Sequence, residues 1–193
     1  MSDTPFTLPP APVELHLETE RLVLRLLGES DLPAMTIYRG DPEVCRYLPF
    51  EPQTADDIRG RIGRLFGSTS LVGENAGVVV GAFRRDDDLL IGDLVLFHLD
   101  AAHGTVEIGW VIRPDLSRQG YATEAARALI DAAFRTFGVR RIVARIDAEN
   151  AASARLAERL GMRLEAHLVK NEWFGGRWAD ELDYAILAEE WPD

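Results

Sequence analysis

The stretch from Trp110 to Ala126 has the residue types and spacing that could bind an anion. Its apolar start predicts a strand that ends before Pro114, because proline has no N–H for a strand ladder. A short polar loop then leads to Gly120, after which apolar residues recur at helical spacing. This arrangement points unpaired N–H groups and the positive end of the helix dipole at one place. We predict a site for an anion there, most plausibly a diphosphate; the alternative is an ordinary loop glycine before a helix.

Two more specific nucleotide-binding motifs are absent from the chain. No G-x-x-x-x-G-K-[ST] occurs, because the one lysine is Lys170, and no G-x-G-x-x-G follows an expected strand. The single cysteine, Cys45, excludes a CxxC metal site and is expected to be a small buried residue. His98 and His103 lack ligand spacing, so we expect no metal.

Composition limits the class of protein. A chain of 193 residues with no long apolar run is expected to form one soluble domain that does not enter a membrane. Its start resembles no secretory signal, so we expect a cytoplasmic location. The net charge of −11 disfavours nucleic-acid binding and favours a cationic partner such as an amine, although solubility alone also explains a negative surface.

The remaining pattern predicts the elements that would position the loop. Strands are expected at 19–27, 78–85, 89–98, 105–112, 141–147, 162–169 and 179–188, and helices at about 31–38, 54–66, 120–137 and 151–160. Short turns make the second to fourth strands an antiparallel meander, and a helical crossover makes the fifth parallel to the fourth. Thr54 and Asn150 are typical helix caps, and Lys170 to Trp178 is expected to be a loop. The pattern indicates an α+β fold.

Several segments together resemble one enzyme family. S-R-Q-G-Y-A, at 117–122, is similar to the Q/R-x-x-G-x-G/A loop that binds the acyl-CoA pyrophosphate in GNAT N-acetyltransferases, although Ser117 departs from its first position. Further matching segments are T-E-R-L-V-L-R at 19–25, V-E-I-G-W-V-I at 106–112, N-A-A-S-A-R-L-A-E-R-L-G-M at 150–162 and G-R-W-A-D-E-L-D-Y-A-I-L near the end. Each is weak alone, but their order over about nine-tenths of the chain resembles the RimJ/RimL type of this family.

The resemblance implies a fold and a cofactor. It implies a single GNAT-like domain at 15–193, after a disordered proline-rich arm at 1–14. Its mixed, mostly antiparallel twisted sheet would have about seven strands and helices on both faces. Acetyl-CoA would lie between the splayed parallel strands 105–112 and 141–147, next to Trp110, Val111, Ile112, Ser117, Arg118, Gln119, Gly120, Tyr121, Ala122, Thr123, Asn150 and Ser153.

The implied reaction is transfer of an acetyl group from acetyl-CoA to a primary amine. A carboxylate or a water molecule that it orders would take the amine proton, and free N–H groups near Val111 or Ile112 would bind the oxyanion. The resemblance implies Glu172 as the base, and Glu107 is the competing carboxylate. Many members have a tyrosine as the acid where this chain has Ala157, so Ser153 is the expected donor to the leaving thiolate.

Several alternatives remain open on the sequence. A GNAT-like module could bind acyl-CoA only to sense it or to assemble partners, and an unrelated nucleotide-binding domain is a third possibility. The acceptor could be a protein N-terminus, a polyamine or a small aminated metabolite. The substrate loops are expected at 45–53 and 170–178, and the protein could be a monomer or a homodimer.

Overall fold

The computed structural model describes residues 15–68, 70–71 and 76–192, and its centre is one twisted sheet. Within these residues the sheet has eight strands in the order β1-β2-β3-β4-β5-β6-β8-β7. Their bounds are β1 His16–Glu18, β2 Leu22–Leu26, β3 Gly77–Arg84, β4 Leu90–Asp100, β5 Thr105–Ile112, β6 Arg141–Asp147, β7 Arg163–Phe174 and β8 Arg177–Leu187. All neighbouring strands are antiparallel except β5 and β6. The expected α+β fold with a mixed, mostly antiparallel sheet is confirmed.

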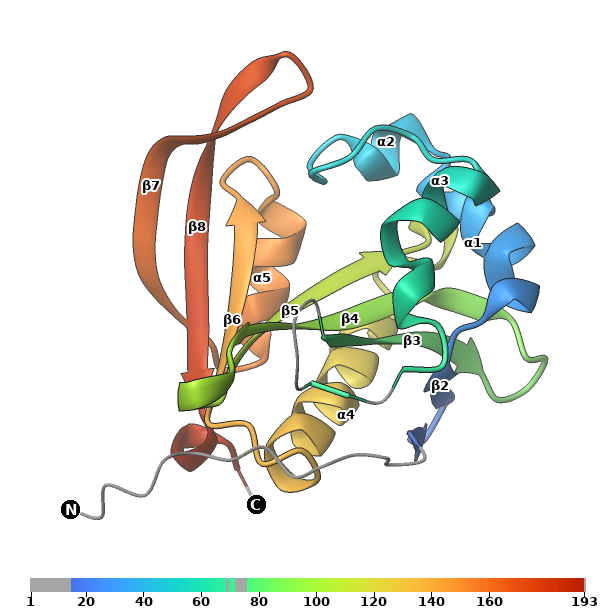
Figure 1. The fold of residues 1–193 in the computed structure, drawn as a ribbon, viewed down its shortest axis with the longest axis horizontal. Helices are drawn as coiled ribbons and strands as arrows, with labels where there is room; N and C mark the ends of the chain where they lie inside the picture. Colours follow the sequence, from blue (N-terminus) through green and yellow to red (C-terminus); the bar gives the residue numbers. More distant parts are fainter. Residues whose placement is uncertain (1–14, 69, 72–75, 193) are drawn as a thin grey trace.

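Helices pack on both faces of the sheet, as expected (Figure 1). The α-helices are α1 Leu32–Arg39, α2 Pro42–Cys45, α3 Ala55–Ile62, α4 Tyr121–Arg135 and α5 Ala151–Arg159. Short 3-10 turns occur at Glu29–Asp31, Gly63–Leu65, Ala101–His103, Pro114–Leu116 and Ala188–Glu190. The helices α4 and α5 share one apolar core with the sheet, and α1 and α3 share another on the opposite face. In the described part of the chain, no helix is both long and apolar enough to span a membrane.

Local sequence signals explain where two of the helices begin. The Thr54 hydroxyl accepts a hydrogen bond from the backbone N–H of Asp57, and the Asp57 carboxylate accepts one from the N–H of Thr54. Asn150 accepts a hydrogen bond from the N–H of Ser153 in the same way at the start of α5. Both predicted caps are confirmed, since each side chain satisfies an N–H that the helix leaves unpaired.

The parallel strands β5 and β6 pair over a short distance and then separate. Their register joins Thr105 to Arg141, Val106 to Ile142 and Glu107 to Val143, and it does not extend further. Both strands continue well beyond this point, β5 to Ile112 and β6 to Asp147. On their outer edges they remain fully paired, β5 with β4 and β6 with β8. The splayed strand pair that the family resemblance implied is therefore present.

Two predictions about the strands are wrong in detail. The first strand does not run from 19 to 27, because His16–Glu18 forms a strand of its own that pairs with β2; this makes eight strands instead of about seven. The expected loop from Lys170 to Trp178 is also mostly strand: β7 continues to Phe174, and β8 already begins at Arg177. The turn is only Gly175-Gly176, where φ values of 56° and 75° favour glycine. The proline-rich arm expected at 1–14 lies outside the described residues.

Candidate active site

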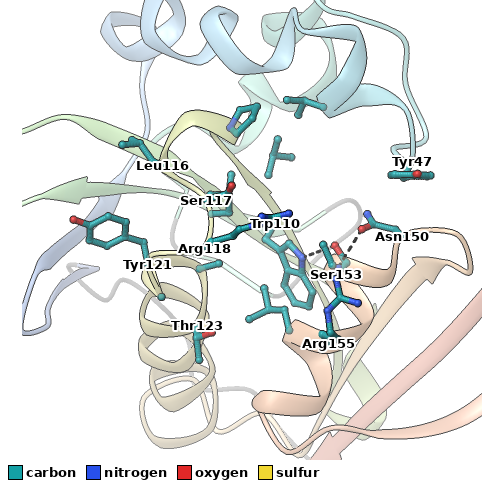
Figure 2. Close-up of a pocket in the computed structure, with 18 of the residues that line it drawn as sticks. Tyr47, Trp110, Leu116, Ser117, Arg118, Tyr121, Thr123, Asn150, Ser153 and Arg155 are labelled. Atoms are coloured by element: carbon teal, nitrogen blue, oxygen red, sulfur yellow. Dashed lines mark hydrogen bonds between the residues drawn. The ribbon is translucent and has the colours of Figure 1, made fainter.

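A cavity of about 740 Å³ lies beside the end of β5 and the starts of α4 and α5. It brings together most of the residues predicted to bind the cofactor: Trp110, Val111, Ile112, Ser117, Arg118, Gly120, Tyr121, Ala122, Thr123, Asn150 and Ser153. Figure 2 shows several of these side chains, which come from both sides of the splayed strands. Gln119 is not among the residues that line the cavity; its backbone carbonyl accepts a hydrogen bond from Arg21 Nη1 at 2.9 Å.

The loop before α4 presents its backbone to this cavity. Arg118 has a φ of 61° and Gly120 a φ of 85°, so the chain turns sharply just before the helix begins. The first intrahelical hydrogen bond here runs from the N–H of Glu124 to the carbonyl of Gly120. The earlier N–H groups of this 15-residue helix therefore have no acceptor within it, and they lie at the positive end of its dipole. This is the anion-binding geometry predicted from the sequence.

A partly exposed ion pair, between Arg21 just before β2 and Glu124 of α4, holds the loop in place. Glu124 accepts hydrogen bonds from Arg21 Nε at 2.7 Å, from the Arg21 backbone N–H at 2.8 Å and from the Thr19 hydroxyl at 2.6 Å. Burial alone would raise the pKa of Glu124, but these hydrogen bonds outweigh it and hold the pKa below its ordinary value. The Arg21 guanidinium also stacks 4.5 Å from the Tyr121 ring centroid, and Figure 2 shows that ring turned away from Trp110 and Ser153.

Arg155 and Arg159 on α5 also line the cavity, and neither was predicted from the sequence. They are four residues apart and therefore lie on the same side of the helix. Arg159 Nε donates to the Thr123 hydroxyl at 3.3 Å, which connects α5 to the start of α4. With Arg118 on the loop, three arginines line the cavity that receives the α4 N-terminus. Their spacing in N-A-A-S-A-R-L-A-E-R was a usable signal, although exposed helix arginines are usually only solvated.

Trp110, Ser153 and Asn150 lie where the two strands separate. The Trp110 indole Nε1–H donates to the Ser153 hydroxyl oxygen at 3.1 Å, and both side chains are half-buried (Figure 2). The Ser153 backbone N–H donates to Asn150 Oδ1 at 3.1 Å, so Asn150 holds the helix turn that carries the serine. Ala157, one turn further along α5, is fully buried in the core and has no polar group to offer. Among these residues, Ser153 is therefore the hydroxyl that can donate a proton to a ligand.

A second cavity, of about 150 Å³, opens on the opposite face of the sheet and shares part of its lining with the first. Trp110, Val111, Asn150 and Ser153 line both cavities, so the two meet in the gap between the splayed strands. Glu107 lines the second cavity. Burial raises the pKa of Glu107, nearby carboxylates add to this rise, and Arg145 Nη1, 3.7 Å from Glu107 Oε2, opposes it.

Glu172 lies on β7, opposite Ala179 of β8, and its side chain is exposed. Its neighbour Trp173 does not shield it from water, because Trp173 is 60% exposed. Trp173 instead packs edge-on against Trp178, with ring centroids 5.5 Å apart. Glu172 is nevertheless close enough to raise the pKa of Glu107 by charge repulsion.

Glu181 is a further carboxyl group in this region and was not predicted from the sequence. It lies on β8, is only 7% exposed and accepts a hydrogen bond from Asn171 Nδ2 at 3.0 Å. Burial, together with Glu172 and Asp183, raises its pKa to about 7. The signal was weak, because a glutamate in an alternating strand usually faces solvent.

Comparison with known proteins identifies the family. A family model described as an acetyltransferase (GNAT) domain matches residues 21–163. The chain belongs to this family. The expected N-acetyltransferase is thereby confirmed, and GNAT acetyltransferases take their acetyl group from acetyl-CoA.

Proteins related to this chain align with nearly its whole length. YnaD of Bacillus subtilis, named as an uncharacterized N-acetyltransferase, is 36% identical over 177 residues, which are 92% of this chain and 99% of that protein. A GNAT acetyltransferase crystal structure from Bacillus anthracis matches with a TM-score of 0.81 and 32% identity, and covers 91% of this chain and 100% of that one. The spermidine N(1)-acetyltransferase of Vibrio cholerae is 26% identical over 172 residues, which are 89% of this chain and 95% of that protein.

The raised pKa of Glu181 predicts how the stability of this acetyltransferase depends on pH. Its folded-state pKa of about 7 exceeds the ordinary 4.5, so between these values the folded state keeps a proton that the unfolded state has lost. Stability should therefore fall as the pH rises through this window. Glu181→Gln should make the fall in melting temperature between about pH 5 and about pH 8 smaller. Each ~1 kcal/mol of pH-dependent unfolding free energy that the substitution removes corresponds to ~2–4 °C.

Glu149→Gln is the matched control, because that carboxylate is exposed and lies two residues beyond Asp147, the strand partner of Glu181. It should keep the pH dependence of the unchanged protein in thermal unfolding followed by circular dichroism. An unaltered pH dependence in Glu181→Gln would contradict the prediction.

Proposed function

We propose that this acetyltransferase transfers the acetyl group of acetyl-CoA to a primary amine that enters through the second cavity. The observation that carries the proposal is that the two cavities meet at Trp110, Val111, Asn150 and Ser153, between the splayed strands. A donor bound on one face of the sheet and an acceptor bound on the other would thus come together at a single place. Bound acetyl-CoA supplies the acetyl group as a thioester.

The first cavity fits the anionic part of such a donor. The N–H groups at the start of α4 would hold the diphosphate, and Arg118, Arg155 and Arg159 would supply positive charge in a chain of net charge −11. Gly120 lets the backbone approach closely, and Ser117, Tyr121, Ala122 and Thr123 complete the loop lining. Gln119 would contribute to the loop only through its backbone carbonyl, which Arg21 contacts, and not through its side chain.

On the acceptor side, a carboxylate would take the proton of the attacking amine. We place this role on Glu107, because it lines the second cavity and its burial raises its pKa toward the range that suits a general base. Glu172 remains the competing base that the family resemblance implied. Near Val111 and Ile112, the backbone N–H groups of β5 that do not pair with β4 would face the gap and stabilise negative charge on the acetyl oxygen.

Ser153 would donate a hydrogen bond to the departing sulfur. The hydrogen bond from Trp110 occupies one lone pair of the Ser153 oxygen and fixes its position, which leaves the hydroxyl hydrogen free to point into the cavity. We therefore propose Trp110 as a positioning residue for Ser153.

The class of acceptor is a finer proposal. The RimJ/RimL resemblance supports a protein N-terminus, and the Vibrio cholerae relative, named for spermidine, supports a polyamine; a small aminated metabolite is the third candidate. We further propose a cytoplasmic enzyme, as a monomer or homodimer. The competing function is a sensor that binds acyl-CoA without turnover, which the buried alanine in place of the usual acid favours.

An acceptor panel tests the proposed function. Peptides with free N-termini, polyamines and aminated metabolites are incubated with acetyl-CoA, and released CoA is measured with a thiol reagent. Release that depends on an amine supports the enzyme. Binding of CoA without release by any amine would support the sensor instead.

Gly120→Val should weaken CoA binding by ~10–100-fold, the loss expected when a charge-assisted hydrogen bond is removed. A side chain there is strained at a φ of 85°, and its Cβ would approach Arg21 Nη2 to 3.3 Å. Calorimetric titration with CoA measures the effect. Gly67→Val is the control, because Gly67 has a φ of 70° but does not line the cavity. Equal CoA affinity in folded Gly120→Val would remove this loop from the binding site.

Ser153→Ala should lower kcat about 10-fold and change CoA affinity little, because the thiolate leaves more slowly without a hydrogen-bond donor. The backbone hydrogen bond to Asn150 does not need the hydroxyl, so α5 should remain capped. Trp110→Phe should give a smaller loss, and the double variant should be no worse than Ser153→Ala alone. An unchanged kcat in Ser153→Ala would show that the serine has no part in the reaction and only belongs to the first turn of α5.

Replacing the general base should remove the acidic limb of the kcat/KM profile against pH and lower the rate by ~10²-fold or more. Since the base must be deprotonated, the unchanged enzyme should lose activity as the pH falls through its pKa. We expect this loss in Glu107→Gln, with Glu149→Gln as the exposed control. If Glu172→Gln alone loses the limb, the role belongs to Glu172. If neither does, solvent deprotonates the amine.

A further inference from the structure

Charged groups of both signs line the second cavity. Arg39 of α1 and Arg61 of α3 both line it, and both guanidinium groups lie near the face of Phe50, at 5.2 and 4.7 Å from its ring centroid. Glu107 lines the same cavity from β5 and does not line the first one. One cavity therefore holds two arginines from the helices and, from the sheet, the carboxylate that we place next to the reacting amine.

The charge of Arg39 is already used within the protein. Arg39 is 3% exposed and makes two hydrogen bonds to the Asp93 carboxylate, from Nη2 at 2.5 Å and from Nε at 2.9 Å. Its Nη1 donates to Gln53 Oε1 at 3.1 Å, and the Tyr38 hydroxyl donates to Asp93 at 2.6 Å. Arg39 thus holds the segment before α3 in place and has little capacity left for a ligand.

Arg61 is different, because no carboxylate of the described residues forms an ion pair with it. Arg61 is exposed to solvent, yet partial burial, with Arg39 and Arg64 nearby, lowers its pKa below the ordinary value. Asp93 compensates the charge of Arg39, so of the two guanidinium groups beside Phe50 it is that of Arg61 that has no carboxylate of the described residues as its partner. A guanidinium that faces a cavity without a partner offers paired N–H donors that match a carboxylate or a phosphate.

The part of the cavity that Glu107 lines is suited to an ammonium group. Glu107 is opposed there by Arg145 alone at 3.7 Å, and the charges of Glu172 and Asp183 reach the same carboxyl. An acceptor with a positive amine near Glu107 and a negative group near Arg61 would be complementary to both charges. A polyamine of the same length would instead place its second ammonium group against the arginines.

We infer that the acceptor is a small amine that carries an acidic group, a carboxylate or a phosphate, which Arg61 binds where α3 lines the second cavity. This inference rests on the proposed function and names its substrate class. It makes Arg61 a specificity-determining residue, which acts on the KM of the acceptor and not on the chemical step.

Matched amines test the substrate class directly. Acetylation is measured with β-alanine, propylamine and 1,3-diaminopropane, and then with the corresponding four-, five- and six-carbon series, which carry an anionic, neutral or cationic end on the same chain. Aminoalkyl phosphates of the same lengths are measured as well, which shows whether the enzyme prefers a phosphate or a carboxylate as the acidic group. We expect kcat/KM to be highest for an acidic member at the length that spans the cavity, and ~10–100-fold above its neutral counterpart.

Variants of Arg61 connect that preference to the residue. Arg61→Gln should raise the KM of the best acidic amine ~10–100-fold, leave the KM of acetyl-CoA unchanged and have little effect on the neutral amine. Arg61→Lys should recover part of the loss. The control is Arg64→Gln, which removes a neighbouring arginine that does not line the cavity.

The outcomes separate this inference from the proposed function. A preference for the neutral or diamino members, or an equal loss with acidic and neutral amines in Arg61→Gln, would overturn the inference while the acetyltransferase reaction stands. If no amine of this set is acetylated but another amine of the wider panel is, the inference also fails and the function holds. Absence of turnover with every amine would refute the proposed function itself.

Discussion

The separation of β5 from β6 is the constraint on which both cavities depend. A parallel pair that stayed in register to its ends would close the sheet, and the residues near Trp110 and Ser153 would face backbone instead of space. The separation is tolerable because each strand keeps a complete antiparallel neighbour on its other edge, β4 for β5 and β8 for β6. Only the groups that face the gap lose their strand partners, and these groups are accessible to water or a ligand, which can satisfy them. The unpaired backbone of the fold thus coincides with the place where a substrate can bind.

Two ion pairs hold the walls of this gap, one on each face of the sheet. Glu124 with Arg21 connects α4 to β2, and Asp93 with Arg39 connects β4 to α1. The Asp93–Arg39 pair is buried and contributes little net stability, since desolvation offsets most of the attraction. The Arg21–Glu124 pair is partly exposed to solvent, so its contribution is also small. Both pairs act on position: each carboxylate accepts several donors, so the helix end that it contacts has one arrangement instead of several. Pairing therefore determines the shape of the cavities more than it determines the free energy of unfolding.

Much of the fold could be predicted from the sequence because its signals are local. Thr54 and Asn150 cap their helices within three residues, and the short turns of the meander leave antiparallel pairing as the simple solution. The β7–β8 hairpin was predicted less well, since both sides of β7 are exposed in its outer half and the residues around Glu172 show no alternation to mark a strand. The partners in the acceptor cavity could not be predicted at all: Arg39 and Asp93 are 54 residues apart, and nothing in either segment alone indicates the other.

Charge is distributed so that a negative chain can bind negative groups. The whole chain carries −11, which repels anions at long range, but solution ions screen that repulsion over about 10 Å. Within the cavities the balance is set at short range by α4 N–H groups and by the arginines of the loop, α5 and α3. Because these donors are fixed to helix ends and to a packed sheet, they need little reorganisation when a ligand arrives. The acidic remainder of the surface then favours an amine over other nucleophiles, while the local arginines decide which amine fits.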